Sequence, residues 1–463
     1  MSRMNSEHIN RPVAEARPVR RRAGGTTGRL LLAAAVVASA GLALPGTSAA
    51  ADAKGAAAQP AGSGSFYDPP AGLPAPDGEL IRTEPMRLGL SLPGLNGPLP
   101  GKATRLMYKS TDSTGAPVAV TGAYIEPSAR WSGDGPRPLV ALAPGTMGQG
   151  DRCAASKALE RPLAVGDGAV SVGYENLAIY RFLQRGVAVV VTDYVGLGTT
   201  DRVHTYVNRV DGGHALLDAA RAARALPGTS LVPTSPTALY GYSQGGGASG
   251  SAAELQPGYA PELNLAGAYV GAPPADLVEV LEGVDGSALA AALGWSINGF
   301  VESAPELKPI VDSYTNDKGK QALADMSTGC VGNGIFGYAG ARSSGWTTTG
   351  QSLPEIVEDE PVLRRVLDAQ RIGRLTPDAP VRVATGVHDG LVPHAQARRL
   401  AADWCVRGAD VTYVPIKGID LKEKLVNHFT PLLSDQTNAI SWVTDRLAGK
   451  PDAPDCATVV KKP

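Results

Sequence analysis

The 463-residue sequence is poor in aromatic side chains, which make up only 5% of it. This scarcity argues against a sugar-stacking or other aromatic-platform protein. The formal net charge is -1 at pH 7, so neither a basic surface for nucleic acid nor an acidic tail for a basic partner is indicated. Hydrophobic residues make up 43% of the chain, which is enough to bury the core of one large domain or two ordinary ones.

The sequence also lacks the motifs that bind common cofactors. No cysteine stands in a CxxC pair, and no histidine lies at metal-ligand spacing from a cysteine. The stretch "GLGTT" at 196–200 lacks the third glycine of a dinucleotide fingerprint. The glycine-rich stretch at 241–247 has no lysine before its serine, as a phosphate-binding loop would require. We therefore expect neither a cofactor nor a metal.

The longest apolar run near the N-terminus, residues 30–44, is shorter than the roughly 20 residues that a membrane span needs. A basic segment precedes this run, and small residues follow it. The order is typical of a secretory signal peptide, with cleavage expected after Ala50 or Ala53. A membrane anchor is the alternative. We predict a signal peptide over 1–50 and a secreted mature chain with no integral membrane span.

Only four cysteines are present: Cys153, Cys330, Cys405 and Cys456. In an exported protein, an even number of scattered cysteines indicates disulfides. Three connectivities are possible, and sequence order suggests Cys153–Cys330 with Cys405–Cys456. Four buried free thiols are the alternative.

Strand-like and helix-like segments alternate over 101–275 and again over 376–450. The continuous β-branched run at 187–196 is typical of a parallel strand covered on both faces. We predict an α/β fold with a mostly parallel sheet and helices on both faces. Residues 276–375 contain several helical patterns and no clear strand, which indicates an inserted helical cap. Residues 51–100, rich in Ala, Gly and Pro, are expected to lie extended on the surface, and 451–463 form a C-terminal tail.

The segment "ALYGYSQGGGAS" at 238–249 carries the strongest chemical signal. Gly241-Tyr242-Ser243-Gln244-Gly245 is a G-x-S-x-G motif with a predicted strand before it and a predicted helix after it, as in a nucleophile elbow. Ser243 would project its Oγ at the N-terminus of the helix, where the dipole favours negative charge. A glycine-rich turn for packing or phosphate binding is the alternative.

An alcohol needs a base to become a nucleophile, and the base needs an orienting acid. In folds with a nucleophile elbow, the catalytic residues follow one another along the chain in the order Ser, then Asp or Glu, then His. Three histidines follow the serine: His388, His394 and His428. We select His428, in a loop after the last predicted strand, and Asp389, just past the apolar strand in "VRVATGVHDG" (381–390). Asp410 and Asp420 are the alternative acids.

The tetrahedral intermediate needs two N–H donors for its oxyanion. One is expected from the backbone of Gln244, the residue after the nucleophile. The other is expected from the loop "PGTMGQGD" after the strand at 137–144, where Thr146 and Met147 are both candidates.

These motifs together resemble the secreted lipase family of fungi and actinobacteria (the lipase A type) within the α/β-hydrolase superfamily. The matching stretches run through most of the mature chain: "PGTMGQGDRCAAS" at 144–156, "TDYVGLGTTDRVHTYV" at 192–207, "LLDAARAARAL" at 216–226, "GYSQGG" at 241–246, "HDGLVP" at 388–393 and "NHF" at 427–429. The most family-specific stretch is "DYVGLGT" followed by His204 and Tyr206. We interpret it as a structural turn rather than as a catalytic role for Asp193. The resemblance implies a Ser243, Asp389 and His428 triad, a cap over the site and two disulfides, whereas "PGTMG" departs from the acidic oxyanion loop of the best-known member.

The predicted activity is hydrolysis of carboxylic esters of lipids, such as triacylglycerols, by a secreted and monomeric enzyme. The apolar run at 288–300 would line an acyl tunnel or contact a lipid–water interface transiently, or it would simply form the core of the cap. The alternatives are a carboxylesterase for small soluble esters, an acyltransferase or peptidase with the same triad, and a binding module without activity.

Overall fold

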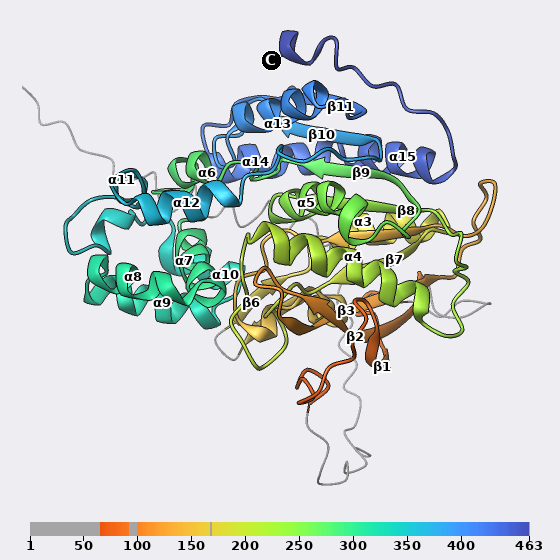
Figure 1. Ribbon diagram of the computed structural model, residues 1–463, viewed down its shortest axis with the longest axis horizontal. Coiled ribbons are helices and arrows are strands. Elements are labelled where there is room, and N and C mark those ends of the chain that lie inside the picture. The colour runs from red at the N-terminus through yellow and green to blue at the C-terminus, as the bar shows by residue number, and fades with distance from the viewer. Residues whose placement is uncertain (1–64, 92–99, 167–168, 463) are drawn as a thin grey trace, which may run out of the picture.

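The computed structural model describes residues 65–91, 100–166 and 169–462 (Figure 1). The predicted signal peptide lies outside these residues. A nine-stranded sheet crosses the molecule in the order β1-β2-β3-β7-β4-β8-β9-β10-β11. Its strands are β1 (Leu80–Met86), β2 (Gly101–Thr111), β3 (Pro117–Pro127), β4 (Leu139–Ala143), β7 (Ala188–Thr192), β8 (Thr237–Tyr242), β9 (Leu265–Gly271), β10 (Val381–Gly386) and β11 (Val411–Ile416).

The sheet is antiparallel at one end and parallel through its centre. β1, β2, β3 and β7 pair antiparallel, whereas β7, β4, β8, β9, β10 and β11 pair parallel. The central strands β4, β8 and β10 are buried at every position, as expected of parallel strands covered on both faces. Parallel strands point their carboxyl ends to one edge of the sheet, and Thr146, Ser243 and Asp389 follow β4, β8 and β10 at that edge.

Helices cover both faces of the sheet, as predicted. One core contains side chains from α4 (Arg209–Ala225), α5 (Gln244–Tyr259) and α13 (His394–Val406), including Leu216, Ala252 and Trp404. The other core contains side chains from α3 (Asn176–Gln184), α14 (Lys424–Ser434) and α15 (Gln436–Leu447), including Phe182, Leu432 and Ile440. Burial of these two apolar layers is the main term that favours the fold.

The segment between β9 and β10 consists of helices joined by loops, and it is called the cap below. It contains α6 (Leu277–Val284), α7 (Ala291–Ser303), α8 (Lys308–Tyr314), α9 (Asp317–Thr328), α10 (Val331–Tyr338), α11 (Leu353–Asp359) and α12 (Pro361–Ala369). These helices lie together beside the sheet, at the left of Figure 1. They share a separate apolar core that includes Trp295, Phe300 and Met326, so the cap has its own packing centre.

Three features differ from the sequence-based expectation. Residues 80–86, expected to be extended on the surface, form β1 and pair with β2. A small hairpin of β5 (Leu163–Gly166) and β6 (Ala169–Val172), together with the short helix α2 (Ala155–Glu160), was not predicted. His428 was expected in a loop, and this is wrong, because it lies inside α14. The Glu423 side chain caps that helix by accepting from Val426 N at 2.8 Å.

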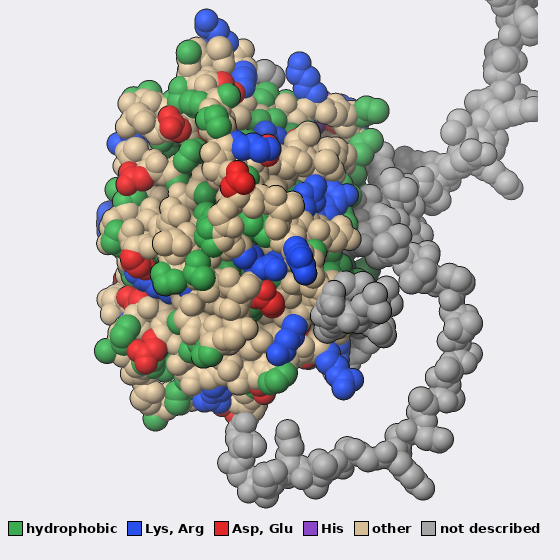
Figure 2. All heavy atoms as spheres, turned by 90° about the vertical axis from the view of Figure 1, so that its right-hand side faces the viewer, with side chains coloured by type: hydrophobic (Ala, Val, Ile, Leu, Met, Phe, Trp, Pro, Cys, Tyr) green, Lys and Arg blue, Asp and Glu red, His purple; other side chains and the backbone are tan. Residues whose placement is uncertain are grey.

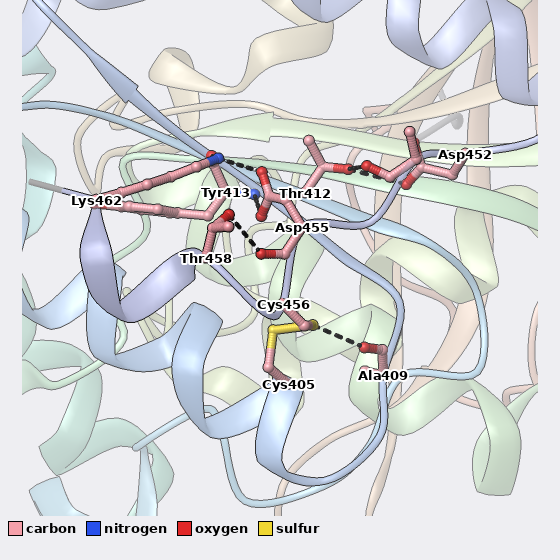
Figure 3. The surroundings of a disulfide bond; sticks show 10 residues. Cys405, Ala409, Thr412, Tyr413, Asp452, Asp455, Cys456, Thr458 and Lys462 are labelled. Carbon is pink, nitrogen blue, oxygen red and sulfur yellow. Dashed lines mark hydrogen bonds and ion pairs between the residues drawn. A yellow bond between two sulfur atoms is a disulfide. The ribbon is translucent and has the colours of Figure 1, made fainter.

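Two disulfides connect Cys153 with Cys330 and Cys405 with Cys456, the pairing that sequence order suggested. The second fastens the C-terminal tail, as Figure 3 shows. Asp455 N donates to Val411 O at 2.9 Å, and Asp455 Oδ1 accepts from Tyr413 N at 3.1 Å. The tail therefore covers the outer edge of β11.

The surface beside the sheet carries both signs of charge. On the face drawn in Figure 2, basic and acidic side chains are interspersed, consistent with a formal net charge of -1. No helix within the described parts of the chain is long and apolar enough to cross a membrane.

Candidate active site

Ser243 lies in a sharp turn between β8 and α5. Its backbone has φ 60° and ψ -125°, a conformation that a residue with a side chain rarely adopts. Two backbone hydrogen bonds stabilise this strained conformation. Ser243 N donates to Gly271 O at 2.9 Å, and Ser243 O accepts from Gly247 N at 3.0 Å. Such backbone strain is typical of functional positions.

Close backbone packing explains two of the neighbouring glycines. A Cβ on Gly241 would clash with Gly245 O, and a Cβ on Gly245 would clash with Ala143 O. Glycine at both positions lets the start of α5 approach the ends of β8 and β4. Ser243 is thereby presented at the carboxyl edge of the sheet.

His428 and Asp389 form a buried pair. His428 Nδ1 lies 2.7 Å from Asp389 Oδ2, and the two residues are only 1% and 4% exposed. Asp389 Oδ1 accepts from the backbone N–H groups of Leu391 and Val392 at 3.0 Å each. Because the carboxylate accepts the Nδ1 proton, the neutral imidazole keeps Nε2 as its free basic atom.

Tyr242 connects this pair to the serine turn. Tyr242 Oη donates to His428 O at 2.7 Å, and the two rings are 5.4 Å apart between centroids. His428 Nε2 is buried and has no hydrogen-bond partner among the described residues, so no hydrogen bond joins it to Ser243 Oγ. Catalytic hydrogen bonds are often long without substrate and shorten when it binds.

The remaining histidines and alternative acids lie elsewhere. His388 is exposed, and His394 Nε2 lies 3.1 Å from Tyr413 Oη. Asp410 is exposed. Asp420 Oδ1 accepts from Lys422 N and from Asn427 Nδ2 at 2.9 Å each. Of the carboxylates weighed from the sequence, Asp389 is the one that contacts His428.

The expected oxyanion residues lie at the same edge of the sheet. Gln244 is the first residue of α5, and Thr146 follows β4; both line a cavity of about 570 Å³ together with Ser243. Within the described chain, no hydrogen-bond acceptor is found for the backbone N–H of Gln244, Thr146 or Met147. Thr146 lines the cavity at Ser243, whereas Met147 belongs to a cluster with Cys153 and Cys330. The cavity lining thus favours Thr146 over Met147.

The oxyanion loop, defined here as residues 144–150, is anchored by groups that the sequence did not single out. Glu175 Oε1 accepts from Gly145 N at 2.8 Å. Tyr194 Oη donates to Pro144 O at 2.6 Å. Burial raises the pKa of Glu175 to about 7. An acidic residue just before a helix is commonplace in sequences, so no local pattern marked Glu175.

Asp193 has a structural role, as interpreted from the sequence. Its carboxylate accepts from Ser156 N at 2.7 Å, Ser156 Oγ at 2.6 Å and Thr121 Oγ1 at 2.8 Å. These contacts fasten the end of β7 to β3 and α2. Asp193 does not line the cavity at Ser243.

The cavity at Ser243 continues toward a second one in the cap. The second cavity has a volume of about 860 Å³ and is lined mainly by apolar side chains. Four side chains line both cavities: Leu281, Ser296, Phe300 and Leu367. Among the described residues, no cluster of three or more His, Cys, Asp or Glu side chains is arranged to hold a metal ion.

Comparisons with known proteins agree with this architecture. Residues 160–454 match the model of the family described as secretory lipase. The chain is 31% identical to a probable inactive lipase of Mycobacterium tuberculosis, over 83% of this chain and 82% of that one. It is 27% identical to a secreted triacylglycerol lipase of Malassezia restricta, over 83% of this chain and 79% of that one.

Among solved structures, Candida antarctica lipase A in its closed state superposes with a TM-score of 0.66 at 19% identity, over 82% of this chain and 84% of that one. At this identity the likeness shows the fold, which confirms the predicted α/β-hydrolase architecture. The family match and the two disulfides identify an exported protein. The chain belongs to the secretory lipase family of α/β-hydrolases.

Proposed function

We propose that this protein hydrolyses carboxylic esters of lipids with Ser243 as nucleophile, His428 as base and Asp389 as orienting acid. The observation that carries the proposal is a buried imidazole next to a strained serine turn: its Nδ1 pairs with a carboxylate at 2.7 Å, and its Nε2 has no partner in the described part of the chain. These groups have the roles that acyl transfer requires.

In the first half-reaction, Ser243 Oγ attacks the ester carbonyl and its proton passes to His428 Nε2. Asp389 stabilises the resulting imidazolium and fixes the tautomer. The backbone N–H groups of Gln244 and Thr146 stabilise the oxyanion, and the position of Gln244 at the start of α5 adds the helix dipole. His428 then protonates the leaving alcohol, and an acyl-enzyme forms on Ser243.

In the second half-reaction, water replaces the alcohol. His428 Nε2 accepts a proton from water as its oxygen attacks the acyl carbonyl, and the same two N–H groups stabilise the second oxyanion. The proton then returns to Ser243 Oγ, which releases the carboxylic acid. An alcohol in place of water would make the enzyme an acyltransferase, so release of free acid distinguishes the two activities.

A lipid acyl chain is the substrate that the cavities favour. The two cavities of about 570 and 860 Å³ share four lining residues, and the second is walled mainly by the apolar core of the cap. A peptidase would need charged groups to hold a substrate terminus, and the lining of these two cavities is neutral. The likeness to a secreted triacylglycerol lipase supports the same choice.

We also propose transient contact with a lipid–water interface by a monomer. Ile419 is 83% exposed and Leu421 is 48% exposed, and both lie just before α14, the helix that carries His428. Exposed apolar side chains near an active site are typical of surfaces that bind lipid. All candidate catalytic residues come from one chain, so no second copy is required.

The direct test is Ser243→Ala compared with Ser313→Ala, an exposed serine on α8. We expect Ser243→Ala to lower the turnover of a fatty-acyl ester by about 10⁴-fold or more and to abolish labelling by a fluorophosphonate. Ser313→Ala should match the wild-type protein in both assays. Because one relative is named a probable inactive lipase, an inactive wild-type protein is the result that would overturn the proposal.

Chain-length preference tests the acyl cavity. Ser296 lines both cavities, so Ser296→Phe should obstruct the path between them. We expect the ratio of palmitate to butyrate ester turnover to fall about tenfold or more. Ser313→Phe, which adds the same ring on the outside of the cap, should leave the ratio unchanged. An unchanged ratio in Ser296→Phe would show that the acyl chain lies elsewhere.

A further inference from the structure

One short segment, His204-Thr205-Tyr206, contacts both residues that carry the proposed oxyanion donors. It follows the family-specific stretch after β7, and the mechanism described above gives it no role. Its two aromatic side chains are buried, at 2% exposure for His204 and 5% for Tyr206. His204 contacts the residue that carries one proposed oxyanion donor, and Tyr206 contacts the residue that carries the other.

His204 holds the side chain of Gln244. His204 Nδ1 lies 2.9 Å from Val195 O, and His204 Nε2 lies 3.0 Å from Gln244 Nε2. Since a carbonyl oxygen only accepts, Nδ1 carries the proton and Nε2 accepts from the Gln244 amide. Burial lowers the pKa of His204 to about 4, so the ring is neutral at pH 7 and this acceptor is available.

Tyr206 holds the side chain of Thr146. Tyr206 Oη lies 2.7 Å from Thr146 Oγ1, and both residues line the cavity at Ser243. The Tyr206 ring packs edge-to-face against His204 and against Trp295 of the cap, with centroids 6.0 and 5.9 Å away. The ring is therefore fixed from two sides, and its hydroxyl fixes Thr146.

We infer that His204 and Tyr206 are positioning residues that hold the two walls of the oxyanion hole at the separation required by the tetrahedral intermediate. This inference rests on the proposed function. The two donors belong to separate segments, one after β4 and one at the start of α5, whose strands β4 and β8 are paired. The 204–206 segment adds a direct link between the two donor residues, because it contacts both of their side chains.

Oxyanion stabilisation depends steeply on donor position, because the donors must lie within hydrogen-bond distance of the oxyanion in the transition state. A misplacement of about 1 Å costs about 100-fold in rate. Loss of a positioning contact should therefore lower kcat and leave KM near its wild-type value, because the ground-state ester does not use these hydrogen bonds fully.

The first experiment removes the Tyr206 hydroxyl and keeps the ring. We expect Tyr206→Phe to lower kcat about 10- to 100-fold with little change in KM, Thr146→Val to do the same, and Thr146→Ser to retain most activity. The double variant Tyr206→Phe/Thr146→Val should have a kcat no lower than that of either single variant, because the two substitutions remove the same contact. Tyr108→Phe is the control, because Tyr108 Oη is also buried and lies 2.7 Å from Thr192 Oγ1 and 2.9 Å from Ala215 O, away from the cavity at Ser243.

The second experiment removes the contact between His204 and Gln244. His204→Asn retains a short donor toward Val195 O and lacks the acceptor that faces Gln244. Gln244→Met leaves the backbone N–H in place and removes the side-chain amide. Each should lower kcat, and the two losses should not add.

A trifluoromethyl ketone provides a readout that altered folding alone would not change selectively. Ser243 Oγ adds to its carbonyl carbon, the serine proton moves to His428, and the carbonyl oxygen becomes an alkoxide in the oxyanion hole. Affinity for this inhibitor should fall in parallel with kcat, while the melting temperature of Tyr206→Phe is no lower than that of Tyr108→Phe, whose hydroxyl has two partners.

The outcomes are distinct. If Tyr206→Phe and His204→Asn keep the kcat and inhibitor affinity of Tyr108→Phe, while Ser243→Ala is inactive, the positioning role is wrong and the proposed function stands. If the wild-type protein releases no acid, both proposals are wrong. A rise in KM with unchanged kcat would assign the segment to substrate binding and would also overturn the inference.

Discussion

At the scale of single residues, the candidate site combines residues that sequence patterns reveal with residues that only contacts reveal. A five-residue motif and the chain order of the fold sufficed to select Asp389 and His428, which the structure places 2.7 Å apart. No sequence pattern marked Glu175, and Tyr206 was noted only as part of a family-specific stretch without a role, because the roles of both depend on contacts with positions 30 and 60 residues away.

Glu175 leads to a prediction about stability. Its ordinary pKa of 4.5 rises to about 7 because burial penalises the charged form. Between pH 4.5 and 7 the unfolded chain loses this proton while the folded protein keeps it, so the free energy of unfolding falls as the pH rises. The difference corresponds to about 3 kcal/mol and is complete above pH 7.

Glu175→Gln has no charge to lose and keeps an acceptor for Gly145 N. Its free energy of unfolding relative to the wild-type protein should therefore rise by about 3 kcal/mol between pH 4 and pH 8, as measured by urea denaturation. Glu358→Gln, at an exposed position on α11, should show no such trend. A pH-independent difference for Glu175→Gln would mean that the carboxyl is ionised in the folded protein throughout.

At the scale of secondary-structure elements, strongly patterned segments were predicted well. The continuous apolar runs predicted central parallel strands, and the helical patterns at 276–375 predicted helices, which α6 to α12 are. Two segments with weak sequence patterns, β1 and α14, were not predicted as a strand and a helix. β1, "LIRTEPM", is mostly half-exposed at the end of the sheet, so it lacks clear alternation. His428 was placed in a loop because the base was expected in the loop after the last strand, whereas the Glu423 cap starts the helix α14 before it.

The cap and the oxyanion loop are joined more closely than their separation in sequence suggests. Val331 N donates to Met147 O at 2.8 Å, and Gln149 N donates to Gly329 O at 2.9 Å. Gln149 Nε2 also donates to Trp295 O at 3.0 Å. The Cys153–Cys330 disulfide also links the segment after the oxyanion loop covalently to the cap. The cap therefore supports the loop that carries Thr146.

This support predicts that the two disulfides differ in function. Removing either by paired Cys→Ala substitution should lower the free energy of unfolding by about 2–5 kcal/mol. Only the Cys153/Cys330 pair should also lower kcat, because only it fixes the oxyanion loop against the cap. Equal kcat values for the two paired variants, assayed below both melting temperatures, would contradict this role.

At the scale of the whole molecule, the nine-stranded sheet ends at β11, whose outer edge would otherwise present unpaired backbone groups. Such edges are templates for association with another chain. The tail covers this one: Asp455 pairs with Val411 O and Tyr413 N, and Lys462 Nζ donates to Tyr413 O at 2.6 Å (Figure 3). Buried Val459 adds an apolar anchor.

We therefore predict that the tail keeps the protein monomeric. A chain that ends at Asp452 and carries Cys405→Ser, so that no free thiol remains at this site, should self-associate as its concentration rises, because the edge of β11 is then open. The control, Cys405→Ser with Cys456→Ser in the full-length chain, retains the hydrogen bonds of Asp455 and Lys462 and should stay monomeric. Light scattering after size exclusion measures both. If the shortened chain stays monomeric at every concentration where it is folded, the tail serves stability alone, and another feature of β11 prevents edge pairing.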